Sequence, residues 1–337
     1  MGDVGYSHSH TDLNHGHHDH THGTIDPVLL TTERGIWAVK WSLIGLAATA
    51  AFQAVIVFFS GSVALLADTI HNTADAATAI PLWIAFTLAR RQPSRRFTYG
   101  YGRVEDVAGV MIVLTILFSA VLAGYESVNR LLDPHPVEHL WAVAIASIIG
   151  FAGNELVALF RIRVGKQINS AALVADGYHA RVDGLTSLGV LFSAVGLWLG
   201  YPLADPIFGL LITIAILPIV WESGKAVFTR LLDGVDPEVI EEITHAINQT
   251  QGVRDVTEVR LRWSGHRLHA EVNLAVNPKL SVAEGHAIAV EVRHQLLHKL
   301  PYLSNVNIHI DPEDRSGEKH HRIKDHTHEG LAVHSHR

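Results

Sequence analysis

Two stretches of the sequence share one pattern: residues 67–75 read ADTIHNTAD, and residues 175–183 read ADGYHARVD. Both fit A-D-x-x-H-x-x-x-D, and each lies inside a long apolar run. On an α-helix, side chains four residues apart share a face and can touch. The histidine and the second aspartate of each copy are therefore expected to converge, so two such helices brought together offer two imidazoles and two carboxylates.

The apolar runs predict a membrane protein, because a spanning helix needs about 20 mainly apolar residues. Six segments meet this condition, and the second and fifth carry the repeated pattern; the segments are 36–58, 63–88, 107–130, 139–161, 171–199 and 204–226. We therefore expect a transmembrane bundle of six helices.

The basic residues between these segments predict their orientation, because cytoplasmic loops carry an excess of Lys and Arg. The connection between spans two and three holds five arginines, and the one between spans four and five holds three basic residues: Arg90, Arg91, Arg95, Arg96 and Arg103, then Arg161, Arg163 and Lys166. These connections should face the cytoplasm. With six spans, both termini then lie in the cytoplasm as well.

The paired motifs predict a metal site inside the membrane. His71, Asp75, His179 and Asp183 form a set of nitrogen and oxygen ligands that suits tetrahedral Zn²⁺. A carboxylate at the bilayer centre costs about 2.5–3.5 kcal/mol, so it stays there only if it is paired, bound to metal or facing water. Histidine must be neutral to bind metal, so binding releases protons and exchange of metal for protons is a reasonable hypothesis.

The first aspartate of each motif has a less defined role. Asp68 and Asp176 either orient the histidines from outside the ligand set or line the water-filled mouth of a cavity; a direct role as metal ligands is the less favoured alternative.

The sequence resembles the cation diffusion facilitator family over residues 35–312, through the paired H-x-x-x-D motifs and the stretch FTYGYGRVE at 97–105. The resemblance implies a homodimeric, proton-coupled exporter of divalent metal, with His71, Asp75, His179 and Asp183 as its transport site. Two histidines and two aspartates favour Zn²⁺, while Co²⁺, Ni²⁺ and Cd²⁺ remain compatible.

The resemblance also implies a charge interlock between the membrane and cytosolic halves, formed by Arg103 and Asp233. Without it, the two residues are a juxtamembrane arginine and a helix-capping aspartate. Some family members hold a further metal in the loop between spans two and three; this chain has Tyr101 at the required histidine, so we expect no site there.

The C-terminal part predicts a small α+β domain with the order α-β-β-α-β, over residues 237–249, 256–263, 267–276, 281–300 and 306–310. Asp236 with Pro237, and Ser281 with Glu284, are signals for helix starts. The order resembles the family's ferredoxin-like, metallochaperone-like cytosolic domain. We therefore divide the chain into a His-rich tail (1–34), a transport domain (35–228), a cytosolic dimerisation domain (229–312) and a second His-rich tail (313–337).

A second metal site is predicted in the cytosolic domain. His309 and Asp311 share a strand face by the two-residue period, as do His269 and Glu271. The resemblance implies that His286, His309 and Asp311 bind zinc at the dimer interface. Two further ligand positions of the family are Thr257 and Asn273 here, so a second cytosolic ion would need a substitute such as His269.

The tails are expected to be disordered, because residues 8–22 and 320–336 hold seven and six histidines without apolar periodicity. They either trap metal weakly near the entrance or are dispensable.

Other features exclude several classes of protein. The chain has no cysteine, so thiolate metal sites and disulfides are impossible. A net charge of -7 argues against a nucleic-acid partner. No H-E-x-x-H is present, which argues against an intramembrane zinc enzyme.

An importer or channel and a membrane metal sensor remain as alternatives. Cytosolic histidine tails and a cytosolic metal domain favour capture from inside, and thus export across the inner (cytoplasmic) membrane.

Overall fold

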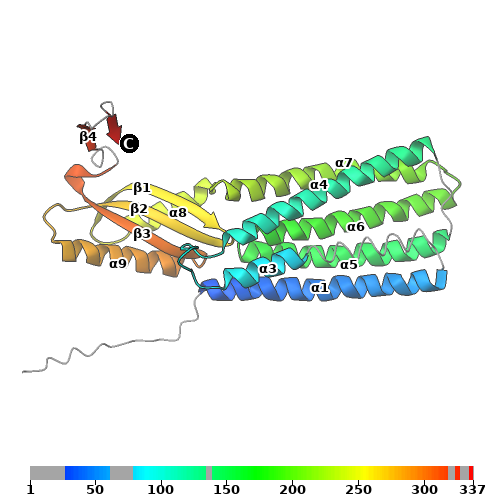
Figure 1. Cartoon of the computed structure of the whole chain (residues 1–337), viewed down its shortest axis with the longest axis horizontal. Coiled ribbons are helices and arrows are strands. Elements are labelled where there is room, and N and C mark those ends of the chain that lie inside the picture. The colour runs from blue at the N-terminus through cyan, green and yellow to red at the C-terminus, as the bar shows by residue number, and fades with distance from the viewer. Residues whose placement is uncertain (1–26, 61–78, 134–138, 318–322, 327–333, 337) are drawn as a thin grey trace, which may run out of the picture.

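The computed structural model describes residues 27–60, 79–133, 139–317, 323–326 and 334–336. Most of the N-terminal tail, Asp68, His71, Asp75 and three of the six C-terminal tail histidines lie outside the described residues. The described part is elongated, with long helices at one end and a small sheet domain at the other (Figure 1).

Five described helices are long and apolar enough to cross a membrane: α1 (Pro27–Ser60), α4 (Arg103–Leu132), α5 (Leu140–Gln167), α6 (Ala171–Trp198) and α7 (Ala204–Leu231). They match the predicted first, third, fourth, fifth and sixth spans. A shorter apolar helix, α3 (Ala79–Ala89), forms the last part of the predicted second span. The rest of that span lies outside the described residues.

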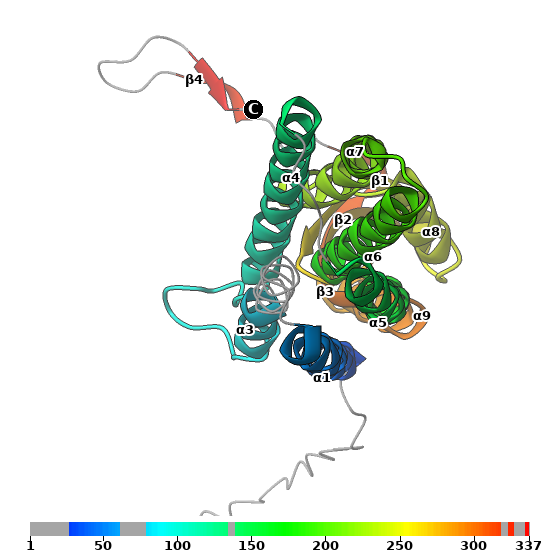
Figure 2. The same cartoon turned by 90° about the vertical axis from the view of Figure 1, so that its right-hand side faces the viewer.

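Helix α6 lies at the centre of the bundle, where it packs against α5, α7 and α4 (Figure 2). Small residues allow this, because a Cβ atom built at Gly189 would lie 2.6 Å from Ile212 of α7. Large apolar side chains such as Phe118, Leu156 and Trp221 are exposed on the outside of the bundle. An apolar outer surface of this kind is what a lipid environment requires.

The cytosolic domain has the predicted order of elements: α8 (Pro237–Asn248), β1 (Val253–Ser264), β2 (Arg267–Val276), α9 (Val282–Lys299) and β3 (Leu303–Pro312). The sheet order is β1-β2-β3, with β1 antiparallel and β3 parallel to β2. Helix α8 packs on β1 and α9 on β3, over a core that includes Ile243, Leu274 and Val292.

Both predicted helix caps are present. The Asp236 carboxylate accepts a hydrogen bond from the backbone N–H of Glu238 at 3.3 Å. Ser281 Oγ accepts from the N–H of Glu284, while the Glu284 carboxylate accepts from the N–H of Ser281 at 2.7 Å. This reciprocal pair is the capping box that the sequence predicts.

The C-terminal tail differs from the expectation of disorder. It contains a short 3₁₀ helix, Glu313–Arg315, and two antiparallel strands, β4 (Ile323–His326) and β5 (His334–His336). Backbone pairing needs no apolar periodicity, which is why the composition of the tail did not predict it. A two-stranded ribbon on its own is marginally stable in water.

Candidate functional site

Helix α6 positions half of the predicted intramembrane site. His179 and Asp183 lie one turn apart, and Nδ1 of the histidine is 3.8 Å from Oδ1 of the aspartate. The His179 side chain is 1% exposed and that of Asp183 is 11% exposed. The two side chains therefore converge inside the bundle, where a metal ion could take one nitrogen and one oxygen ligand from the same helix.

The other half of the predicted site, His71 and Asp75, lies outside the described residues. Within the described ranges, no three histidine, aspartate or glutamate side chains form a metal-binding cluster. The four-residue ligand set stays a prediction, supported by the described half and by the matching sequence of residues 67–75.

Asp176 is fully buried and makes an ion pair with Arg161 of α5, with 3.0 Å between Nη1 and Oδ2. The pair lies one helical turn from His179, on the side nearer the cytosolic domain. The predicted place of Arg161 is a cytoplasmic loop, because its charge indicates a basic residue between two spans. In the structure it lies within α5 with 1% of its side chain exposed.

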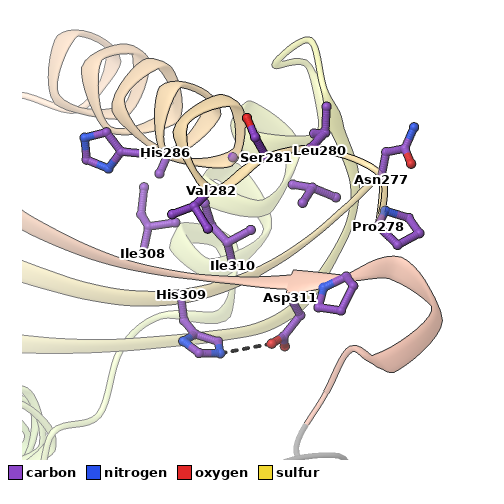
Figure 3. Close-up of a pocket in the computed structure, with 14 residues that line it drawn as sticks. Asn277, Pro278, Leu280, Ser281, Val282, His286, Ile308, His309, Ile310 and Asp311 are labelled. Atoms are coloured by element: carbon purple, nitrogen blue, oxygen red, sulfur yellow. Dashed lines mark hydrogen bonds and ion pairs between the residues drawn. The ribbon is translucent and has the colours of Figure 1, made fainter.

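The predicted cytosolic site is partly assembled. His309 and Asp311 lie side by side on β3, with 3.0 Å between Nε2 and Oδ1 (Figure 3). Asp311 is buried, while the His309 side chain is 55% exposed. Such a pair offers a nitrogen and an oxygen to an ion approaching from outside.

His286 does not join this pair within one copy of the chain. In Figure 3, His286 projects from α9, Ile308 and Ile310 point from β3 toward that helix, and His309 and Asp311 point to the opposite side of the strand. His286, His309 and Asp311 all line one cavity of about 440 Å³ between the start of α9 and the end of β3, but they do not form a metal-binding cluster within the described residues.

His269 lies farther along the sheet. It pairs with Asn305 across the strands, whereas His309 pairs with Asn273, four residues away on β2. At about 3.3 Å per residue this is roughly 13 Å. Burial lowers the pKa of His269, and Arg262, Arg267 and Arg103 lower it further. These arginines oppose a bound cation, and a ligand role for His269 remains a prediction.

Arg103 and Asp233 form an ion pair across the two halves of the chain. The Arg103 guanidinium also donates to the backbone carbonyls of Arg230 and Leu231, each at 3.3 Å. A cation at the C-terminus of a helix stabilises its unpaired carbonyls. Both side chains are about half exposed, so the predicted interlock is a solvent-accessible contact.

A second, buried junction was absent from the sequence predictions. The turn between β1 and β2 inserts His266 against the helices, where its Nδ1 is 2.7 Å from Glu105 Oε2 and its Nε2 is 2.9 Å from Thr32 Oγ1. Next to it, the N–H of Gly265 donates to the Asp106 carboxylate at 3.1 Å. The side chains of Glu105 and His266 are each 1% exposed.

Two sequence signals pointed weakly at this junction. The 97–105 stretch ends at Glu105, an acidic residue at the start of a span, and Ser264-Gly265 marks the turn that carries His266. Neither signal identifies the other, because the two residues are far apart in the chain and meet only through the packing of two domains.

Comparison with known proteins adds to this geometry. The sequence model of the family described as "Cation efflux transmembrane domain" matches residues 39–232, and that of "Cation efflux protein, cytoplasmic domain" matches residues 235–313. A protein named "Probable cation efflux system protein" from Mycobacterium tuberculosis is 54% identical over 86% of this chain and 88% of its own.

Two further relatives are more distant. A "Manganese efflux system protein MneP" from Bacillus subtilis is 27% identical over 84% of this chain and 99% of its own. A solved structure of MamM CTD in its manganese form is 25% identical, covers 23% of this chain and 96% of its own, and has a TM-score of 0.22.

Proposed function

The chain belongs to the cation efflux, or cation diffusion facilitator, family, and we propose that it exports Zn²⁺ from the cytoplasm in exchange for protons. Membership makes it a multi-pass membrane transporter of divalent cations. The observation that carries the proposal is the buried His179–Asp183 pair of α6, repeated in sequence at His71 and Asp75.

The ligand chemistry supports zinc as the substrate. Two imidazoles and two carboxylates match the donors of tetrahedral Zn²⁺, whereas Mn²⁺ prefers an all-oxygen set. The relative named for manganese efflux makes Mn²⁺ the second candidate. Co²⁺, Ni²⁺ and Cd²⁺ fit the same donors, so a competition assay has to include them.

Proton exchange follows from the same residues. A histidine that binds metal must be neutral, so metal entry releases protons and proton entry expels metal. His179 and Asp183 then alternate between a metal-bound and a protonated state as the site opens first to one side and then to the other. The return of the empty transporter carries protons in the opposite direction.

We also propose a homodimer joined through the cytosolic domains, in the inner membrane, with both termini in the cytoplasm. His286 projects away from His309 and Asp311 of its own chain, so the predicted three-residue site is completed by a second copy. The basic connections on the side of the cytosolic domain support this orientation.

The test is zinc uptake into proteoliposomes under an imposed pH gradient, with the full chain and with Asp75→Ala and Asp183→Ala. Removal of one ligand should reduce metal affinity by more than the roughly 10–100-fold that loss of a supporting outer residue causes. Glu126→Gln is the matched control, because Glu126 is an exposed carboxylate of α4 paired with Arg130.

We expect flux that requires the gradient, is lost in both aspartate variants and is unchanged in the control. Flux that survives both aspartate substitutions would mean that the intramembrane pairs are structural. Import, or flux indifferent to the gradient, would contradict the proposed direction or coupling.

A further inference from the structure

Three polar side chains form a stripe along α6. Asp176, His179 and Asp183 are spaced i, i+3 and i+7, so they share one face of the helix. His179 and Asp183 belong to the predicted ligand set. Asp176 is also a carboxylate, is completely buried and lies one turn away, which makes it a third potential oxygen ligand for a cation at this site.

Arg161 of α5 contacts that carboxylate. Its Nη1 is 3.0 Å from Asp176 Oδ2, and both side chains are shielded from solvent. Neither oxygen of Asp176 accepts a well-formed hydrogen bond from the described residues, so Arg161 is its charge partner within that part of the chain. The positive charge of the guanidinium balances the negative charge of the carboxylate that it contacts.

The packing of α5 on α6 fixes this arrangement. A Cβ atom built at Gly177 would lie 2.9 Å from the backbone nitrogen of Ile162 and 3.1 Å from the Cβ of Arg161. The glycine thus lets the two backbones touch beside Asp176. The Cβ of Arg161 is thus held against the backbone of the residue that follows Asp176, and the short turn between the helices leaves little freedom to separate them.

A second ion pair joins the same helices beyond His179. Arg181 of α6 donates to both carboxylate oxygens of Glu155 on α5, at 2.7 and 3.2 Å. These side chains are 29% and 28% exposed. In this pair the arginine lies on α6 and the carboxylate on α5, the reverse of Arg161 and Asp176. Because it is partly exposed, it serves as an internal comparison for the fully buried pair.

Stability alone does not account for the buried pair. Removing two charges from water is expensive, and a well-packed apolar pair of similar volume is often as stable. The buried pair lies one turn from His179, the proposed metal ligand. Unlike an apolar pair, it places a carboxylate and a guanidinium beside the site, and these affect which oxygen ligands and how much charge the ion meets.

We infer that Arg161 is a specificity-determining residue, which withholds Asp176 from the transported ion and so limits α6 to one imidazole and one carboxylate ligand. This inference rests on the proposed function of His179 and Asp183. Without Arg161, the Asp176 carboxylate becomes available as an additional oxygen donor with an additional negative charge. Such a change favours ions that prefer oxygen, such as Mn²⁺, over Zn²⁺, which accepts imidazole readily.

The test measures KM and the maximal rate for Zn²⁺ and Mn²⁺ in proteoliposomes, with the full chain and its variants. In Arg161→Gln we expect the ratio of KM for Zn²⁺ to KM for Mn²⁺ to rise by about tenfold, equivalent to about 1.4 kcal/mol. Arg161→Lys and the neutral double variant Arg161→Gln/Asp176→Asn should keep the original ratio. Arg181→Gln is the matched control on the same helix pair and should also keep it.

Asp176→Asn keeps the inference testable if Arg161→Gln fails to fold. It leaves the guanidinium unpaired near the site, so KM should rise for both ions and their ratio should stay the same. An altered ratio in Asp176→Asn would show that Asp176 binds the ion directly and would overturn the inference. An unchanged ratio in folded Arg161→Gln, or a double variant that shifts as much as Arg161→Gln, would overturn it as well.

These outcomes separate the inference from the proposed function. If Asp183→Ala abolishes flux and the ratios do not respond to Arg161, the transport site stands and the role of Arg161 is purely structural. If Asp183→Ala retains full flux, the ion does not use this site and both proposals fail together.

Discussion

Replacing His266 by alanine should undock the β1–β2 turn from the transmembrane helices. The imidazole contacts Glu105 at 2.7 Å and Thr32 at 2.9 Å in a site with almost no solvent exposure. After the substitution, Glu105 Oε2 keeps the backbone N–H of His266, at 3.2 Å, and Ser170 and Arg230 still interact with the carboxylate. Oε1 of Glu105 already lacks a hydrogen-bond partner among the described residues.

The magnitude follows from this incomplete pairing. Leaving a buried polar group unsatisfied costs about 1–3 kcal/mol, and breaking a buried ion pair by removing one partner costs about 3–5 kcal/mol. Because the backbone hydrogen bond survives, we expect the docked state to lose about 2 kcal/mol of stability, within the first of these ranges. Since 1.4 kcal/mol is a factor of about ten, the undocked population should rise by roughly 30-fold.

Hydrogen exchange measured by mass spectrometry reports this population directly. The amides of Gly265 and His266 are bonded to Asp106 and Glu105 only while the turn is docked, so their exchange should accelerate by about 10–100-fold. The amide of Val272, inside β2, is an internal control that should not change. His245→Ala, at an exposed position of α8, is the matched histidine variant.

A double-mutant cycle completes the experiment. Glu105→Gln should destabilise the docked turn alone, but the combination with His266→Ala should cost less than the sum of the two, because the same contact is lost once. Unchanged exchange at Gly265 in His266→Ala, or strictly additive effects, would refute the claim that this contact holds the domains together.

Two further predictions concern the cytosolic domain. Ser281→Ala removes the capping box formed with Glu284 and should destabilise α9 by about 1 kcal/mol, seen as faster amide exchange in its first turn; unchanged exchange would contradict it. His286→Ala and His309→Ala should each weaken zinc-dependent dimerisation, measured by sedimentation. If the site lay within one copy of the chain, His286→Ala would leave the dimer unaffected while zinc still bound to His309 and Asp311.

The elements that the sequence predicted well are those set by local physics. The apolar length of a span and the side chains that cap a helix are both readable within a few residues, and the predicted caps at Asp236 and Ser281 are confirmed. Helix α1 begins at Pro27 rather than at residue 36. Four polar residues at 31–34 interrupt the apolar sequence, and a search for apolar length does not detect a helix that extends beyond the bilayer.

The features that the sequence did not predict depend on contacts between distant residues. From its charge alone, Arg161 is expected in a loop. In the structure, the short turn after α5 places Asp176 of α6 against it. Glu105 and His266 lie in different domains, and nothing near either residue specifies the other. A charged residue shows that a partner is required, but only the packing of helices decides which residue the partner is.

The two buried junctions are linked through α4. Glu105 lies in the first turn of that helix and accepts the docked turn, while a Cβ atom built at Gly109, one turn later, would lie 3.2 Å from the Cβ of Ala172 in the first turn of α6. Asp176 follows Ala172 by one more turn and connects to Arg161. Contiguous packing of this kind couples two sites energetically only if an element between them has two arrangements; the docked His266 turn and the undocked turn expected in His266→Ala would be two such arrangements. The undocking caused by His266→Ala should therefore change the maximal rate of the proposed zinc flux, while the KM for zinc, which we propose His179 and Asp183 set, stays the same.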